Sequence, residues 1–594
     1  MNEQTKPTGS TRAAVVLAGA LFIAASVTSC GGCGKKAPTG FVPDDATAVA
    51  LVPSVKGAVV RLQQLLKRVQ GGVLSSAILA APRTLIEREL GIDPTSPKSI
   101  REKGIDPERG LAIASVGSSV VLVCGVADEA KLRKHLEWLA NRVLRGAAKM
   151  KTKGNITLVH SEGVDRPRAG FAFAKKHLVL VVARPDPTAD MPSSQPASGS
   201  DSDKKKAAAD PKGQGQGGGV AELLARLLTL DKTIESNPRF VAARKTLGKY
   251  QLMLYVDGVA ARRVVEERNK RMMARASDWM KKYIRERQKL SKAAFGYFGG
   301  FALAVRMRPD ELALRSYYKV PEQRSKQIAA LLKGRGDSPP FGKYIGADAL
   351  VVGRGAIDFK RLLDQALELL PTFAKRRIYR KMERLERENN FSLEKDVLSL
   401  LGNRYAGALY PPRGGLSSPP RTPVAIANAA PVALMAQVED AKKAAALLAR
   451  LERAMVMRGA AVRTRSAGER KIYTLELGGE PLVSWAQARK VIVVATGKRL
   501  DATLKLIDKG GSNILDHMPT TRSKSLMKSD NAFVISADVS KISDMLRNLD
   551  LPAVEKIALA PFFAAVAKIK SVTIAAEHKG GGVLGELSIL FAGK

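Results

Sequence analysis

The sequence predicts an α+β fold built as two tandem copies of one unit, and three observations lead to that prediction. Short apolar, strand-like runs occur as neighbouring pairs instead of alternating strictly with helices, which favours largely antiparallel sheets packed on helices. Hydrophobic residues make up 45% of the 594 residues, which supports ordinary hydrophobic cores in more than one domain. One series of strand and helix patterns occurs before residue 335 and again after residue 341.

Each series begins with an Asp-Ala pair that leads into a strand and then a helix. The first is FVPDDATAVALVPSVKGAVVRLQQLL from Phe41, and the second is YIGADALVVGRGAIDFKRLL from Tyr344. LAIASVGSSVVLVCGVADEAKLRK from Leu111 then corresponds to VAIANAAPVALMAQVEDAKKAA from Val424. In both of these we expect a strand hairpin followed by an amphipathic helix.

Three further pairs of segments follow in the same order. They are HLVLVVA from His177 with KVIVVAT from Lys490, YQLMLYVDGVAARRVV from Tyr250 with NAFVISADVSKISDML from Asn531, and GFALAVRMRPDELALRSYYK from Gly300 with SVTIAAEHKGGGVLGELSILF from Ser571. An ordered series of matches is the mark of an internal repeat. We therefore expect residues 41–335 to form repeat copy one and residues 341–594 to form repeat copy two.

Two low-complexity segments interrupt the copies. Residues 185–219 are rich in Pro, Gly, Ser, Asp and Lys and cannot bury enough apolar surface to fold, so we expect a disordered insert. Gly213, Gly215 and Gly218 match G-x-G-x-x-G there, but no strand precedes them, as a dinucleotide loop would require. Residues 411–423, PPRGGLSSPPRTP, are expected to be a second loop insert.

The amino-terminal segment has the organisation of a secretory signal peptide. Arg12 precedes an apolar block of about 15 residues, from Ala13 to Val27, which is shorter than the roughly 20 residues that span a bilayer. The residues that follow complete the sequence Val27-Thr28-Ser29-Cys30, which resembles the lipobox of bacterial lipoproteins.

This resemblance implies a specific mature protein. Residues 1–29 would be removed as a lipoprotein signal peptide, the thiol of Cys30 would be diacylglycerated, and its new amino group would be acylated, for example with palmitate. Residues 30–40 would form a lipidated tether, and several acyl chains together anchor a protein stably. Gly31, where an Asp would favour the inner membrane, favours the outer membrane, with the protein facing the periplasm or the cell surface.

The pair Cys30 and Cys33 also forms a C-x-x-C pattern, for which redox or zinc chemistry is the alternative explanation. A structural zinc site needs four ligands, and the third and last cysteine, Cys124, lies far away in an apolar run. We therefore expect no metal and no cofactor.

The rest of the chain loosely resembles uncharacterised bacterial envelope proteins, which implies no activity and no functional residue.

Local catalytic signatures do not occur in the sequence. The chain has five histidines, none within metal-ligand spacing of another, and it contains no H-E-x-x-H, G-x-S-x-G or G-x-x-x-x-G-K-[ST] motif. Asp44 and Asp45 are adjacent, so on a strand their side chains point to opposite faces, and a role at the strand entry is expected. An envelope enzyme, such as a hydrolase with a non-contiguous site, remains the alternative to a non-catalytic binding or scaffolding protein.

The net charge of +41 indicates anionic partners. For an exported lipoprotein these are anionic lipid, lipopolysaccharide, peptidoglycan or an acidic protein, and no nucleic acid is expected. The best candidate contact is a long helix predicted over residues 261–290, whose apolar stripe comprises Val265, Met272, Ala276, Trp279 and Tyr283. A neighbouring stripe comprises the candidate anion-binding residues Arg271, Arg275, Lys282, Arg285 and Lys289. The alternative is an ordinary solvated face whose Arg and Lys stems cover apolar surface.

Overall fold

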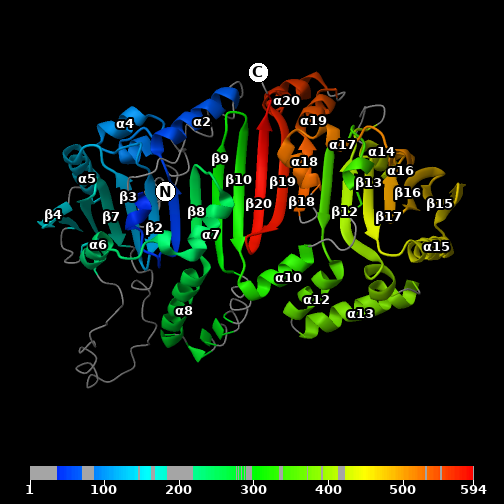
Figure 1. The fold of residues 1–594 in the computed structure, drawn as a ribbon, viewed down its shortest axis with the longest axis horizontal. Coiled ribbons are helices and arrows are strands. Elements are labelled where there is room, and N and C mark those ends of the chain that lie inside the picture. The colour runs from blue at the N-terminus through cyan, green and yellow to red at the C-terminus, as the bar shows by residue number, and fades with distance from the viewer. Residues whose placement is uncertain are drawn as a thin grey trace, which may run out of the picture. The chain divides into compact units, whose positions relative to one another are not determined.

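The computed structural model describes residues 37–69, 84, 86–144, 148–161, 167–183, 219–275, 298–332, 339–370, 372–389, 392–412, 422–528, 532–548 and 552–592, with isolated residues between 277 and 288. The chain divides into two compact units, which are described one at a time (Figure 1). Unit 1 comprises Met1–Lys67 and Ser75–Pro309, and unit 2 comprises Arg68–Leu74 and Asp310–Lys594.

Unit 1 contains an antiparallel sheet with the strand order β4-β5-β6-β7-β3-β2-β1-β8-β9. The strands are β1 (Ala48–Val52), β2 (Leu111–Val116), β3 (Ser119–Gly125), β4 (Ala148–Lys153), β5 (Ile156–Ser161), β6 (Ala169–Ala174), β7 (His177–Ala183), β8 (Leu252–Asp257) and β9 (Gly300–Met307). The helices are η1 (Pro38–Phe41), α2 (Val55–Val69), α4 (Pro97–Glu102), α5 (Glu129–Val143), α6 (Val220–Leu228), η2 (Ile234–Ser236), α7 (Pro238–Leu247) and α8 (Gly258–Arg275).

Both faces of the unit 1 sheet are covered where its core forms. On one face Leu132 of α5 packs among Ile113, Phe171 and Leu178. On the other face α6 and α7 pack on the strands, and the ring of Phe240 meets that of Tyr255 edge-on at 5.2 Å. Strands buried on both faces have apolar residues at successive positions, as the sequence of β3 does.

Unit 2 contains an antiparallel sheet with the strand order β14-β15-β16-β17-β13-β12-β11-β18-β19-β20-β10. The strands are β10 (Glu311–Lys319), β11 (Val351–Ala356), β12 (Leu401–Leu409), β13 (Val432–Val438), β14 (Ala461–Ala467), β15 (Arg470–Leu477), β16 (Glu480–Ala488), β17 (Val491–Thr496), β18 (Ala532–Asp538), β19 (Ile569–Lys579) and β20 (Gly582–Phe591).

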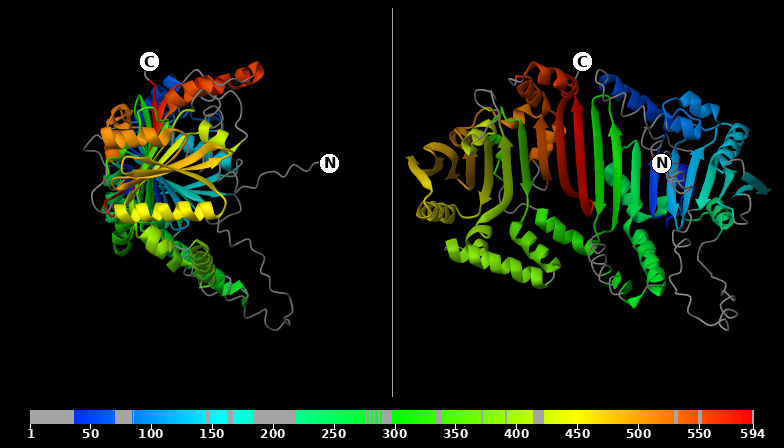
Figure 2. Two further views of the ribbon diagram at one scale, coloured as in Figure 1. Left: turned by 90° about the vertical axis from the view of Figure 1, so that its right-hand side faces the viewer. Right: turned by 180° about the vertical axis from the view of Figure 1, so that it is seen from behind.

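The helices of unit 2 lie at the ends of these strands and on the sheet faces (Figure 2). They are α10 (Glu322–Leu332), α11 (Phe341–Tyr344), α12 (Phe359–Leu369), α13 (Thr372–Asn389), η3 (Leu393–Leu398), α14 (Pro423–Ala429), α15 (Ala441–Met457), α16 (Arg499–Lys509), α17 (Ile514–His517), α18 (Thr521–Lys528), α19 (Val539–Arg547) and α20 (Ala553–Val566). Leu500 and Leu504 of α16 and Met527 of α18 belong to the core cluster on one face of the sheet.

The predicted α+β class with antiparallel strands is confirmed. The two units also share a strand order, because β4 to β9 are arranged in unit 1 as β14 to β19 are in unit 2. The aspartates of the Asp-Ala pairs have similar partners as well: Asp45 pairs with Arg226 at 2.9 Å and Asp348 with Arg499 at 2.7 Å. Two tandem copies stay a prediction, with which these shared features agree.

Two features differ from the expected arrangement. The segment from Val424, expected to be the first strand of a hairpin, is helix α14, because the Thr422 hydroxyl accepts a hydrogen bond from the Ala425 N–H and Pro423 starts the first turn. In place of the expected hairpin partner, strand β12 pairs with β13. Strand β10, which the sequence places in copy one, pairs with β20 from Glu311 to Lys319 and belongs to compact unit 2.

Several expected segments lie outside the described residues. These are the signal peptide, Cys30 and most of the tether, the insert 185–219 except Gly219, and residues 413–421 of the second insert. Within the described part of the chain, no helix is both long and apolar enough to cross a bilayer.

Candidate functional site

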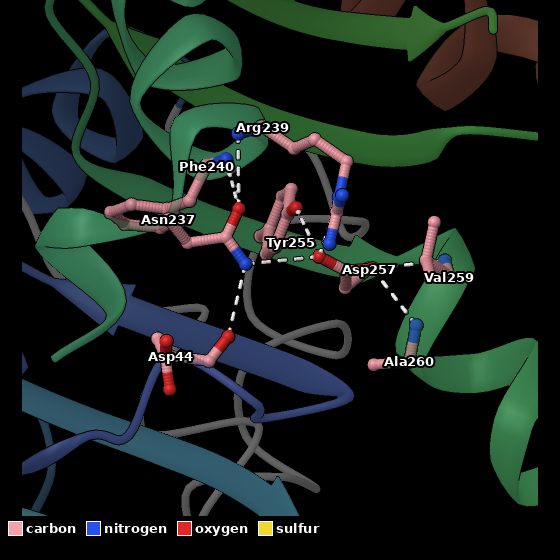
Figure 3. A network of polar contacts seen from close by, with 8 residues as sticks. All are labelled: Asp44, Asn237, Arg239, Phe240, Tyr255, Asp257, Val259 and Ala260. Atoms are coloured by element: carbon pink, nitrogen blue, oxygen red, sulfur yellow. Dashed lines mark hydrogen bonds and ion pairs between the residues drawn. The ribbon is translucent and has the colours of Figure 1, made fainter. Parts of the chain in front are cut away.

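A buried carboxylate, Asp257, organises polar contacts where β8 passes into α8 (Figure 3). Its Oδ1 accepts hydrogen bonds from the N–H groups of Val259 and Ala260 at 2.9 and 3.0 Å, which caps α8. Its Oδ2 accepts from Asn237 Nδ2, Arg239 Nε and the Tyr255 hydroxyl at 3.0, 2.9 and 3.1 Å. Asp257 is therefore surrounded by donors on both of its oxygens.

These donors keep Asp257 ionised inside the protein. Burial raises the pKa of the carboxyl, but the hydrogen bonds from the Ala260 N–H, Arg239 and Asn237 outweigh burial and hold the pKa below its usual range. Burial and the adjacent carboxylate raise the pKa of Tyr255. Asp257 is thus an acceptor occupied by protein groups, and its role is structural.

Asn237 extends the Asp257 contacts to the start of the unit. Its Nδ2 also donates to the backbone oxygen of Asp44 at 3.0 Å, and its Oδ1 accepts from the N–H groups of Arg239 and Phe240. Asp44 therefore takes part through its backbone at the entry to β1. In unit 2 the residue at the end of β18, Asp538, is partly exposed and accepts from the Lys541 N–H at 3.1 Å.

The buried histidines occupy separate places in unit 1. His135 lies on α5, with its ring stacked on that of Trp138 at 5.5 Å, and His177 lies at the start of β7 with Nδ1 3.1 Å from the Lys175 oxygen. Burial, and secondarily the charge of Lys103, lower the pKa of His135 to about 4, so this residue is neutral near pH 7. Their surroundings indicate that both histidines contribute to packing inside unit 1.

Metal and thiol chemistry find no support in the part of the chain that the structure describes. No group of three or more His, Cys, Asp or Glu side chains there could hold a metal ion. Cys124 is buried in the sheet, and burial raises the pKa of its thiol to about 12, so the reactive thiolate is not populated near pH 7.

Most of the candidate anion-binding side chains lie outside the described residues. Helix α8 comprises Gly258–Arg275, and the described residues 278, 280, 281, 284, 285 and 288 are helical as well, within the helix predicted over residues 261–290. The side chains of Arg271 and Arg275 lie outside the description, as do Lys282 and Lys289. Arg285 is exposed, and the intervening Asp278 pairs with Lys281 at 3.2 Å. The anionic contact at this helix stays a prediction.

A second basic helix, α13, was missed by the sequence reasoning. Its partly buried side chains include Ile378 and Met382, four positions apart, while Phe373 and Tyr379 are exposed. Its exposed basic residues include Arg376, Arg377, Arg380, Lys381, Arg384 and Arg387. The spacing of apolar residues in TFAKRRIYRKMERLEREN is the signal that could have revealed this helix.

One exposed apolar surface is a face of the unit 2 sheet, which we call the open face. It lies on strands β13, β12, β11, β18, β19, β20 and β10, on the side opposite α16 and α18. Its central row consists of residues that lie side by side across these strands: Leu434, Gly407, Gly353, Ile535, Ile574, Leu587 and Leu314.

Two further rows flank the central row. One consists of Val432, Leu409, Val351, Ala537, Val572, Ile589 and Leu312, and the other of Ala436, Tyr405, Gly355, Phe533, Ala576, Gly585 and Ser316. Every residue of the three rows is at least partly exposed, and none is charged. The alternating residues, such as Val352, Val534 and Ala575, are buried in the core beneath.

The open face has large side chains beside glycines. Leu434, Phe533, Ile535 and Ile574 are between 36% and 54% exposed. A Cβ atom on Gly407 would lie 2.9 Å from Leu434 Cδ2, and one on Gly355 would lie 2.9 Å from Phe533 Cδ2. The glycines therefore let Leu434 and Phe533 lie over the neighbouring strands.

Helices of unit 2 border the strands at both ends. In Figure 1, α12 and α13 lie at one end of the unit 2 strands, and α19 and α20 lie at the other. Phe359, the first residue of α12, is exposed, and its ring meets that of Tyr405 at 5.0 Å. Backbone groups within the open face are paired in the strand ladders, so the surface presents mainly hydrocarbon to a ligand.

The comparisons with known proteins assign no function. A model of the family described as "Protein of unknown function (DUF3352)" matches residues 232–592. No curated protein matches the chain.

Similar solved structures include crystal forms III, I and IV of TP0453. Their identities are 12%, 11% and 13%, and their TM-scores are 0.23, 0.23 and 0.22. The matches cover 51%, 52% and 50% of this chain and 90%, 89% and 83% of those chains.

Proposed function

Since the chain belongs to the DUF3352 family, for which no function is described, we propose a function from its own residues. It is a lipid-anchored lipoprotein of the bacterial cell envelope with a non-catalytic binding role, and the open face of unit 2 is its binding surface. The lipobox-like sequence ending in Cys30 supports the anchor, and Gly31 favours the outer membrane.

The observation that carries the binding role is the exposure of Phe533, Ile535 and Ile574 on the neighbouring strands β18 and β19, and of Leu434 on β13 of the same open face. Contiguous apolar surface of this kind is typical of interaction sites. Removing apolar surface from water contributes about 25 cal/mol per Å², so a hydrocarbon ligand that covers these side chains gains affinity without needing polar partners.

The basic charge supports an anionic head group on that ligand. The chain carries a net charge of +41, and α13 presents exposed arginines at one end of the unit 2 strands. Among the anionic partners considered, anionic lipid and lipopolysaccharide possess acyl chains that could lie on the open face, whereas peptidoglycan does not. An anionic lipid is therefore the ligand class that these residues support best.

Displacement of a fluorescent fatty acid by phosphatidylglycerol tests this proposal on protein purified from membranes. Ile535→Gln and Ile574→Gln place amide groups on the open face and should weaken binding several-fold with little change in melting temperature. Val456→Gln on α15 is the matched control, because Val456 is similarly exposed but lies outside the open face. Equal affinities for the parent and the open-face variants would refute the binding surface.

A further inference from the structure

Helix α20 exposes apolar side chains on its outer surface. Val554 and Ile557 are 79% and 75% exposed, and Leu559 and Phe562 are also exposed. The sequence AVEKIALAPFFAAV contains only two charged residues, Glu555 and Lys556. A helix that is apolar all round is normally buried, so the exposure of α20 indicates that something covers it.

Protein partly covers the carboxyl-terminal end of α20, whereas its amino-terminal half has no cover among the described residues. Helix α20 packs against α19, and Phe563, Ala565 and Val566 are partly buried. Every residue from Ala553 to Ala560 is exposed, including Val554 and Ile557. In helix α16, by contrast, the apolar residues Leu500, Leu504 and Ile507 are buried.

We propose that α20 is an interfacial helix that inserts its exposed amino-terminal half into the hydrocarbon edge of the bilayer to which the protein is anchored. This inference rests on the proposed function, because the lipid anchor holds the chain at a bilayer surface. A helix of 14 residues is about 21 Å long, at 1.5 Å per residue, and a hydrocarbon core is about 30 Å thick. Helix α20 therefore lies along the interface and does not cross it.

Three exposed cations lie near α20 and favour an anionic phospholipid surface. Arg547 precedes the helix, Lys556 lies in its first turn and Lys570 follows it, and they outnumber the exposed carboxylates of Asp544 and Glu555. Phosphate groups of anionic lipids complement these cations.

The test measures the depth of a fluorophore on α20 in the full, acylated chain. A Cys33→Ser background leaves the buried Cys124 as the unacylated thiol, so a nitrobenzoxadiazole label on Ile557→Cys is selective. The protein is reconstituted in vesicles of phosphatidylcholine and phosphatidylglycerol that contain lipids with nitroxide-labelled chains. Met457→Cys is the matched control, because Met457 is 81% exposed at the end of α15.

The nitroxide lipids should quench the label at position 557 several-fold more than the label at position 457. Equal quenching, with the protein still floating with the vesicles, would overturn the role of α20 and leave the anchored lipoprotein standing. Shielding of position 557 that rises with protein concentration in vesicle-free detergent would assign the surface to a second copy and also overturn the proposal. A chain without acyl mass on Cys30 would contradict the proposed function, and quenching at position 557 after vesicle addition would still decide the role of α20.

Discussion

Arg239 donates a hydrogen bond from Nε to Oδ2 of Asp257 at 2.9 Å, and this contact ties the start of α7 to the end of β8. The Asp257 carboxylate is completely buried, whereas the Arg239 side chain is 36% exposed. Removing the partners of a buried charge is costly, because the charge is then left uncompensated inside the protein. Replacing the buried acceptor by a donor is costly for the same kind of reason.

Asp257→Asn should destabilise unit 1 by about 3 kcal/mol. An amide must direct its NH₂ group either at the N–H groups of Val259 and Ala260 or at the side-chain donors, so donors face donors in either orientation. Amide hydrogen exchange in β1 and β8 measures the loss.

The matched control for Asp257→Asn is Asp538→Asn in unit 2. Asp538 is partly exposed and caps α19, and Asn is an equally good N-cap residue, so this replacement should cost only a few tenths of a kcal/mol. Equal losses in the two variants would contradict the role assigned to the buried donors around Asp257.

His135 should make the protein less stable as the pH falls from about 6.5, the pKa of an unfolded histidine, to about 4. Burial lowers the pKa of His135 in the folded state, so the unfolded chain binds the proton first and protonation favours unfolding. His135→Phe retains a ring to stack on Trp138 and should show a smaller loss of stability over this range.

Urea unfolding at a series of pH values measures the His135 effect. Above pH 7 both proteins have an uncharged ring at this position, so their difference should be constant there. Stability curves that run parallel through the acidic range would show that His135 does not supply the effect.

Cys30 should be the acylated amino terminus of the mature protein. Mass spectrometry of protein purified from membranes should show that residues 1–29 are absent and that acyl mass lies on Cys30. Cys30→Ser should lose this acyl mass and the stable anchor, while Cys33→Ser should retain both, because only Cys30 follows the lipobox-like residues. A Cys30→Ser protein anchored like the parent would contradict the lipoprotein assignment.

Replacing the candidate anion-binding residues should reduce binding to anionic vesicles or lipopolysaccharide. The variant changes Arg271, Arg275, Lys282, Arg285 and Lys289 to Gln and should keep its melting temperature. The binding that it loses should be salt-sensitive in the parent, because the screening length is about 10 Å at 0.1 M salt and shortens as salt is added.

Helix α15 provides the control for that experiment, because the proposed function gives its basic residues no role in binding. Changing Lys442, Lys443, Arg450, Arg453 and Arg458 to Gln removes the same number of exposed positive charges from this helix and its carboxyl end. Equal losses in the two variants would indicate a general effect of net charge and contradict a specific contact.

By itself, the sequence determined the features that depend on local pattern. Paired apolar runs indicated antiparallel strands, and Asp257 and Asp538 stand where a strand passes into a helix, because the same short sequence supplies the strand and the helix cap. The local pattern misled at Val424, where the cap formed by Thr422 and Pro423 begins a helix in an apolar segment.

Only the tertiary structure decided which apolar residues are covered. Leu434 and Met435 are neighbours of similar hydrophobicity, yet Met435 is buried in the unit 2 core and Leu434 is exposed on the open face. Burial in a strand depends on which distant helix packs on each face, and α16 lies more than sixty positions further along the chain. The exposure of α20 and the pairing of β10 with β20 likewise depend on segments that are distant in sequence, so no local pattern contains them.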